Sequence, residues 1–123
     1  VIRLGRKLGF KTISIVRRAE QAQELKSLGG NEVLSQGDGD IVARVKQITA
    51  GVGVPYAIDC VGGKTGSDMV RCLAPGGGMV LFGTMSGEPI SFSNRDLMTP
   101  AASLHGFWLG NFMSGLPLLR KIS

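Results

Sequence analysis

The chain alternates short runs of β-branched and apolar residues with segments whose apolar residues recur every three or four positions. The short runs predict buried β-strands, and the longer period predicts amphipathic helices. The predicted strands are 11–16, 32–34, 56–59, 78–82 and 103–107. The predicted helices are the end of one at 1–8, then 19–28, 40–49 and 67–74, and one that begins at Pro117.

Glycine, proline and aspartate separate these segments. Asp40 is positioned to cap the helix that follows it, and Pro75 is expected to end helix 67–74. Residues 76–78 are three glycines and predict a turn before the fourth strand. Asp59 is interpreted as a turn or cap residue. Residues 84–100 contain few apolar repeats and predict a long irregular excursion.

The alternation of strands and helices predicts a doubly wound parallel α/β sheet. Each connection is long enough to return the chain for parallel pairing. In such sheets, ligands bind beyond the carboxyl ends of the strands. The excursion at 84–100 is therefore expected on the ligand side of the sheet.

The composition excludes several classes of protein but does not identify the function. The chain has 123 residues, 43% of them hydrophobic, and a net charge of +5, which is consistent with one small folded domain. The basic residues are dispersed, which argues against a nucleic-acid partner. No apolar run approaches the roughly 20 residues of a membrane span.

The two cysteines and the single histidine do not have the spacing of a metal site. Cys60 is expected at a strand end and Cys72 inside a helix, both as buried free thiols. Such thiols favour a reducing compartment, the cytoplasm or the mitochondrial matrix. His105 is interpreted as a structural residue of the last strand. The chain starts at Val1, and the sequence leaves open whether a targeting peptide was removed.

The end of the first complete strand carries Arg17 and Arg18. Many dinucleotide-binding folds place an acid here, which binds the adenosine ribose. A guanidinium instead matches a phosphate in charge and geometry. The pair therefore predicts a site for the 2′-phosphate of NADP. The alternative is a pair of solvated loop arginines.

Three later strand ends provide further candidates for cofactor binding. A nicotinamide ring needs an apolar surface and backbone donors for its carboxamide. The alternative for the apolar side chains is ordinary core packing. The candidates are Cys60, Val61, Gly62, Gly83, Met85, Phe107, Trp108 and Leu109.

Several segments in this order resemble the cofactor domain of the medium-chain dehydrogenase/reductase superfamily. More narrowly, they resemble its zinc-independent quinone oxidoreductases and 2-enoyl thioester reductases. The segments are a helix end at Leu8–Gly9, a strand end at Val16–Arg18, then Leu25–Gly30, Asp59–Gly63, Leu73–Gly77, Phe82–Gly83 and Gly106–Leu109.

The resemblance implies a Rossmann-like domain that binds NADPH. Hydride would pass to the β-carbon of an activated double bond in a small-molecule substrate. By resemblance, Arg17 and Arg18 bind the 2′-phosphate. Cys60–Gly62, Met85 and Phe107–Leu109 would line the nicotinamide half of the site. The resemblance also implies a homodimer.

The same resemblance implies that residues 1–123 are a partial NADP-binding domain. The family's first strand, its glycine-rich turn and its catalytic domain would precede Val1, so no catalytic residue is assigned. Without that first strand, strands 11–16 and 56–59 lose a shared neighbour and expose unpaired edges. We expect the chain to re-pair its strands, borrow one from another copy, or need a partner.

Two other functions fit the same residues. The chain could be the cofactor domain of a zinc-type alcohol dehydrogenase, whose metal ligands would lie upstream. It could also be a non-catalytic nucleotide-binding module. A preference for NADPH that depends on Arg17 and Arg18 would favour an NADPH-binding enzyme domain.

Overall fold

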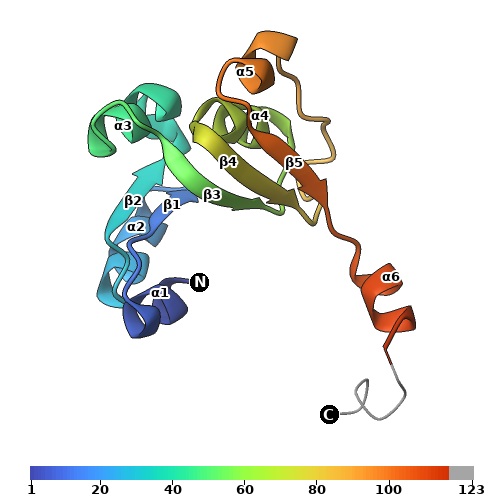
Figure 1. The fold of residues 1–123 in the computed structure, drawn as a ribbon. Helices are drawn as coiled ribbons and strands as arrows, with labels where there is room; N and C mark the ends of the chain where they lie inside the picture. The colour runs from blue at the N-terminus through green and yellow to red at the C-terminus, as the bar shows by residue number, and fades with distance from the viewer. Residues whose placement is uncertain (117–123) are drawn as a thin grey trace. The chain divides into compact units, whose positions relative to one another are not determined.

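The computed structural model describes residues 1–116, and the helix predicted from Pro117 lies outside this range (Figure 1). The chain divides into two compact units, Val1–Gln47 and Ile48–Ser123. Each unit has its own parallel sheet and its own helices.

The first unit contains a two-stranded parallel sheet with helices before, between and after its strands. The register runs from Ile13 opposite Glu32 to Val16 opposite Ser35. Val33 and Leu34 of β2 are buried in its core, and Leu34 is fully buried. The elements are α1 (Ile2–Leu8), β1 (Ile13–Val16), α2 (Glu20–Ser27), β2 (Glu32–Ser35), the 3₁₀ turn η1 (Gln36–Asp38) and α3 (Ile41–Ile48).

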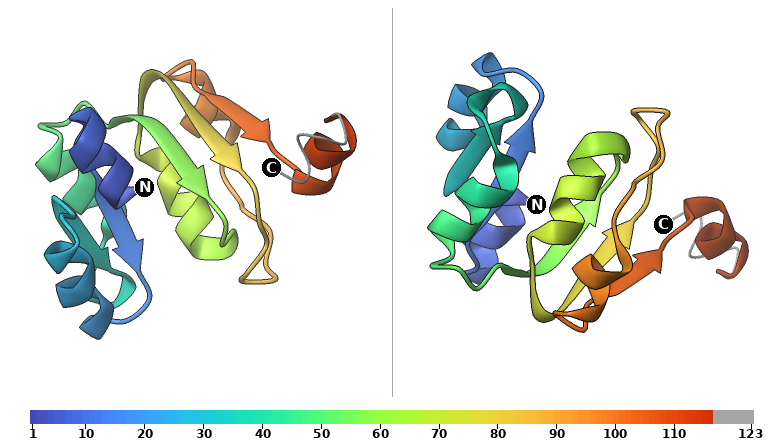
Figure 2. Two further views of the ribbon diagram at one scale, coloured as in Figure 1. Left: turned by 90° about the horizontal axis from the view of Figure 1, so that it is seen from below. Right: turned by 90° about the horizontal axis from the view of Figure 1, so that it is seen from above.

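The second unit contains a three-stranded parallel sheet in the order β3-β4-β5. Helix α4 lies along one face of this sheet (Figure 2). Val70 of α4 packs there with Leu73 and Met79 of β4. The elements are β3 (Val54–Asp59), α4 (Gly63–Arg71), β4 (Leu73–Leu81), α5 (Asn94–Met98), β5 (Ser103–Gly106) and α6 (Leu109–Ser114).

The predicted α/β architecture with parallel strands is confirmed. Within residues 1–116 the strands form two sheets, in agreement with the expectation that strands 11–16 and 56–59 lack a shared neighbour. β1 pairs with β2 alone, and β3 pairs with β4 alone. One hydrogen-bonding edge of β1 and one of β3 therefore have no strand partner among the described residues.

The boundaries around α4 differ from the sequence prediction. The helix begins at Gly63 instead of Ser67, because Gly62 and Gly63 adopt φ values of +76° and +55° that turn the chain directly into the helix. It ends at Arg71, so Cys72 forms the C-cap instead of lying inside the helix. Neither cysteine forms a disulfide within the described residues: Cys72 is buried and its Sγ donates to Asp68 O (3.2 Å), whereas Cys60 directly follows β3 and is half-buried.

Pro75 was predicted to end the helix, but this prediction is wrong. The residue lies inside β4. The register shifts from Val54 opposite Leu73 to Tyr56 opposite Gly78, which leaves the intervening residues in an irregular stretch of the strand. A residue without an N–H group is tolerated in such a stretch. The predicted glycine turn at 76–78 is therefore part of β4, and Gly76 N–H donates to Pro100 O (2.7 Å).

The predicted irregular segment 84–100 contains helix α5. A reciprocal capping box begins this helix, in which Ser93 N–H donates to Asp96 Oδ2 (3.0 Å). Helix α6 was also not predicted. No helix within residues 1–116 is long and apolar enough to span a membrane.

Candidate functional site

Arg17 and Arg18 directly follow β1 and are both exposed to solvent. Arg18 N–H donates to Gln21 Oε1 (3.2 Å), which ties the turn to the first turn of α2. Within the described part of the chain, neither guanidinium forms a hydrogen bond or an ion pair. Glu20 lies in the first turn of α2, where its negative charge interacts favourably with the helix dipole. Two cations without a counter-ion are therefore available to an anion at this strand end.

The turn after β3 is organised by the carboxylate of Asp59. This residue is 3% exposed. Its Oδ1 accepts hydrogen bonds from Val61 N–H (2.8 Å) and Gly62 N–H (3.2 Å), and its Oδ2 lies 3.1 Å from Gly62 N. Asp59 is therefore a turn residue, as predicted. The amides of Val61 and Gly62 are bonded within the chain and are not open to a phosphate.

The first amide of α4 is also bonded within the chain. Gly63 N–H donates to Glu88 O (2.9 Å), a carbonyl of the segment that follows β4. This bond satisfies one of the N–H groups that a helix leaves without a partner at its start. The N-terminus of α4 is thus closed by the protein's own backbone.

The segments after β3 and β4 are joined beyond the ends of the two strands. Met85 N–H donates to Cys60 O (3.1 Å), and Ser86 N–H donates to Val61 O (2.9 Å). Gly83 approaches so closely that a Cβ at this position would lie 2.7 Å from Cys60 O. The structure therefore brings together Cys60, Val61, Gly62, Gly83 and Met85.

This junction offers both polar and apolar groups to a ligand. The N–H groups of Gly83 and Thr84 donate no hydrogen bond within residues 1–116. The Met85 side chain is 79% exposed. Backbone donors beside an accessible apolar side chain are the features that a planar amide-bearing ring requires.

The residues after β5 are accessible rather than packed in the core. Phe107 N–H donates to Leu81 O (2.8 Å), which extends the pairing of β5 with β4. The exposed fractions are 41% for Phe107, 69% for Trp108 and 62% for Leu109. Trp108 and Leu109 begin α6, and the rings of Phe107 and Phe112 lie 5.5 Å apart. These exposures argue against the core-packing alternative.

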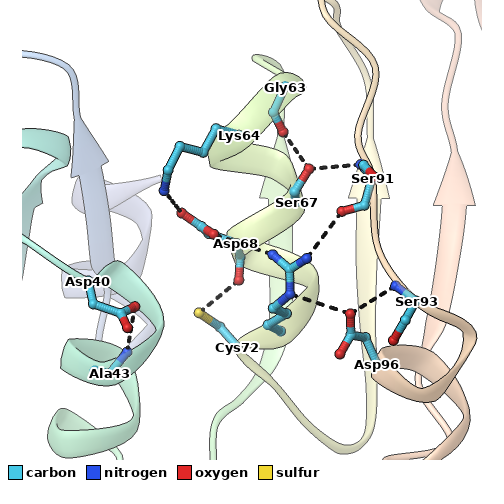
Figure 3. Close-up of polar contacts among 11 residues, drawn as sticks. Asp40, Ala43, Gly63, Lys64, Ser67, Asp68, Cys72, Ser91, Ser93 and Asp96 are labelled. Atoms are coloured by element: carbon cyan, nitrogen blue, oxygen red, sulfur yellow. Dashed lines mark hydrogen bonds and ion pairs between the residues drawn. The ribbon is translucent and has the colours of Figure 1, made fainter.

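A polar network on α4 was not predicted from the sequence (Figure 3). Ser67 Oγ accepts a hydrogen bond from Ser91 N–H (2.8 Å). Arg71 Nε lies 3.4 Å from Asp96 Oδ2, and Arg71 Nη1 lies 3.4 Å from Asp68 Oδ1. These contacts fasten α4 to the segment after β4 and to the start of α5. The spacing of Ser93 and Asp96 and the i,i+3 spacing of Asp68 and Arg71 are sequence signals that could have revealed part of the network.

Titratable side chains do not form a metal centre in the described residues. No group of three or more histidine, cysteine, aspartate or glutamate side chains in residues 1–116 has a metal-binding arrangement. His105 lies in β5 and is exposed. The candidate residues therefore offer a ligand positive charge, backbone N–H donors and apolar surface.

Comparisons with known proteins agree with this fold. The family model described as zinc-binding dehydrogenase matches residues 1–123. The chain therefore belongs to the zinc-binding dehydrogenase family, within the medium-chain dehydrogenase/reductase superfamily. Its homologues include enoyl reductases and quinone oxidoreductases, the zinc-independent branch.

The chain is 36% identical over 116 residues to the mitochondrial enoyl-[acyl-carrier-protein] reductase of Caenorhabditis elegans, covering 91% of this chain and 32% of that protein. A quinone oxidoreductase structure from Pseudomonas syringae pv. Tomato has a TM-score of 0.79 and 29% identity, covering 90% of this chain and 34% of that one. A structure of an Etr1p mutant in complex with NADP and crotonyl-CoA has a TM-score of 0.79 and 25% identity. The match covers 98% of this chain and 36% of that one. The chain thus spans about a third of the length of its curated relatives.

Proposed function

We propose that this chain is the NADPH-binding part of a reductase that transfers hydride to an activated carbon–carbon double bond. Arg17 and Arg18 would hold the 2′-phosphate of the cofactor. The donors Gly83 and Thr84 would receive the nicotinamide carboxamide, and Met85, Phe107, Trp108 and Leu109 would supply apolar surface. Cys60–Gly62 would support this half of the site. When bound, NADPH supplies the hydride.

The observation that carries the proposal is the absence, within residues 1–116, of any anionic partner for the two guanidiniums after β1. An exposed arginine pair without a carboxylate favours a ligand with an additional phosphate. The similar Etr1p mutant structure, which is a complex with NADP and crotonyl-CoA, supports both the cofactor and the type of substrate. The enoyl reductase relatives support the same reaction class.

Several parts of the proposal concern the whole enzyme. The relatives are about three times as long, so a substrate pocket and proton donor would be supplied by sequence other than these 123 residues. A small enoyl thioester, enone or quinone is the proposed substrate class. A homodimer is proposed as the assembly, in a reducing compartment.

Titration calorimetry on the full chain tests the cofactor assignment. We expect NADPH to bind about tenfold or more tightly than NADH, because charged hydrogen bonds contribute about 1.5–3 kcal/mol. Arg17→Ala and Arg18→Ala should each reduce this preference. Lys11→Ala is the matched control, because it removes an exposed cation from the other end of β1. Equal affinity for both cofactors would overturn the proposal.

A further inference from the structure

Ser67 makes a long-range contact that its position on α4 does not require. The residue is 7% exposed, and its Oγ donates to Gly63 O (2.7 Å), a bond within the helix. The same Oγ accepts a hydrogen bond from Ser91 N–H (2.8 Å), 24 residues further along the chain. The hydroxyl therefore joins α4 to the segment that follows β4 (Figure 3).

The other hydrogen bonds between this segment and the elements next to it are made by the backbone of the segment. Arg71 Nη2 donates to Ser91 O (3.4 Å), so both polar groups of the Ser91 backbone are bonded to α4 side chains. Glu88 O accepts from Gly63 N–H (2.9 Å), and Ser86 N–H donates to Val61 O (2.9 Å). Ser67 is the most buried of the side chains in this set and the one with the shortest bond to the segment.

The fixed segment begins next to the free backbone donors. Gly83 and Thr84 immediately precede Met85 and Ser86, whose N–H groups bond to the turn after β3. The directions of the Gly83 and Thr84 N–H groups therefore depend on how firmly residues 85–91 are held. A donor contributes most to binding when the surrounding structure holds it in place before the ligand arrives.

We infer that Ser67 is a positioning residue for the nicotinamide half of the site. It fixes residues 85–91 against α4 and thereby orients the Gly83 and Thr84 donors, without touching the cofactor. This inference rests on the proposed function, in which those donors receive the carboxamide.

The test compares two ligands and two local substitutions in the full chain. Ser67→Ala removes the acceptor for Ser91 N–H, and Ser67→Thr retains it. Ser27→Ala is the matched control, because Ser27 Oγ makes only a helix-internal bond to Glu24 O (2.6 Å). Affinity is measured for NADPH and for 2′,5′-ADP, which carries the 2′-phosphate without a nicotinamide. Hydrogen exchange is followed over residues 83–93.

We expect Ser67→Ala to weaken NADPH binding by about fivefold and to leave 2′,5′-ADP binding unchanged, in line with the loss of one well-placed hydrogen bond. Exchange over residues 83–93 should become faster, Ser67→Thr should restore both properties, and Ser27→Ala should alter neither. If Ser67→Ala weakened the binding of both ligands equally, or left hydrogen exchange unchanged, the role of Ser67 would be overturned and the proposed function would still stand. A starting chain that does not prefer NADPH would overturn the proposed function.

Discussion

Gly66 brings the backbone of α4 directly against the buried carboxylate of Asp59. A Cβ at position 66 would lie 2.5 Å from Asp59 Oδ2 and 2.5 Å from Ile90 Cγ2. A side chain there would have to displace both the Asp59 carboxylate of the turn after β3 and the Ile90 side chain of the segment after β4. The close approach of these two segments therefore depends on a glycine in the middle of a helix, where glycine is otherwise unfavourable.

We expect Gly66→Ala to destabilise the chain by about 1–3 kcal/mol, the usual cost of overpacking a buried site. Urea denaturation followed by circular dichroism measures the change. Gly106→Ala is the control, because no heavy atom lies within 4 Å of a Cβ at that position. A control that loses as much stability as Gly66→Ala would contradict the packing explanation.

Asp59 provides a second test of the same turn. Asp59→Ala should lower the free energy of unfolding by about 2–4 kcal/mol, because it leaves the buried amides of Val61 and Gly62 without an acceptor. Asp59→Asn keeps one oxygen acceptor and should lose less. Thermal unfolding measures both variants.

Asp40→Ala serves as the comparison for Asp59. Asp40 Oδ1 accepts one exposed hydrogen bond from Ala43 N–H (3.2 Å), the cap predicted from the sequence. Loss of such a cap costs about 1 kcal/mol. If removing Asp40 destabilised the chain more than removing Asp59, the burial of Asp59 would not be the decisive factor.

Arg71 connects α4 to α5 through Asp96 and to the intervening segment through Ser91. We expect Arg71→Leu to reduce stability by about 1 kcal/mol, a modest value because the guanidinium is partly exposed and screened. Lys64→Leu is the control: Lys64 pairs with the same Asp68 (2.8 Å), but its side chain is 87% exposed. Unfolding in low and high salt should show a salt-sensitive loss for Arg71→Leu and little change for Lys64→Leu.

The open edges of β1 and β3 predict self-association of the isolated chain. Unpaired strand edges present backbone groups that pair readily with another strand. Size-exclusion chromatography with light scattering should therefore show a mass above that of one chain, increasing with concentration. A stable monomer with well-protected β1 and β3 amides would contradict this expectation.

Local patterns in the sequence predict much of the fold. Strand β1 is rich in β-branched residues, and Asp40 precedes an apolar helix period, so both predictions depend on neighbouring residues alone. The prediction that Pro75 ends a helix is wrong because the position of Pro75 within a strand depends on the irregular pairing of β4 with β3. That pairing is a tertiary property. Helix α5 was missed although Ser93 and Asp96 carry its capping signal.

Only part of the candidate site could be selected from the sequence. The rule that ligands bind beyond parallel strand ends selected Gly83 and Met85, and the structure places both beside Cys60. Ser67 was not found, because its decisive partner is Ser91, and no local pattern relates residues so distant in the chain. The same holds for Gly66, whose role depends on Asp59 and Ile90.

The hydrogen bonds that fix the segment after β4 against α4 are made by main-chain atoms of the segment: the carbonyl of Glu88 and both polar groups of Ser91. Every amino acid except proline offers the same N–H and C=O groups, so the exposed side chains at these positions can vary while the anchorage persists. Substitutions of those exposed side chains should therefore cost little folding stability.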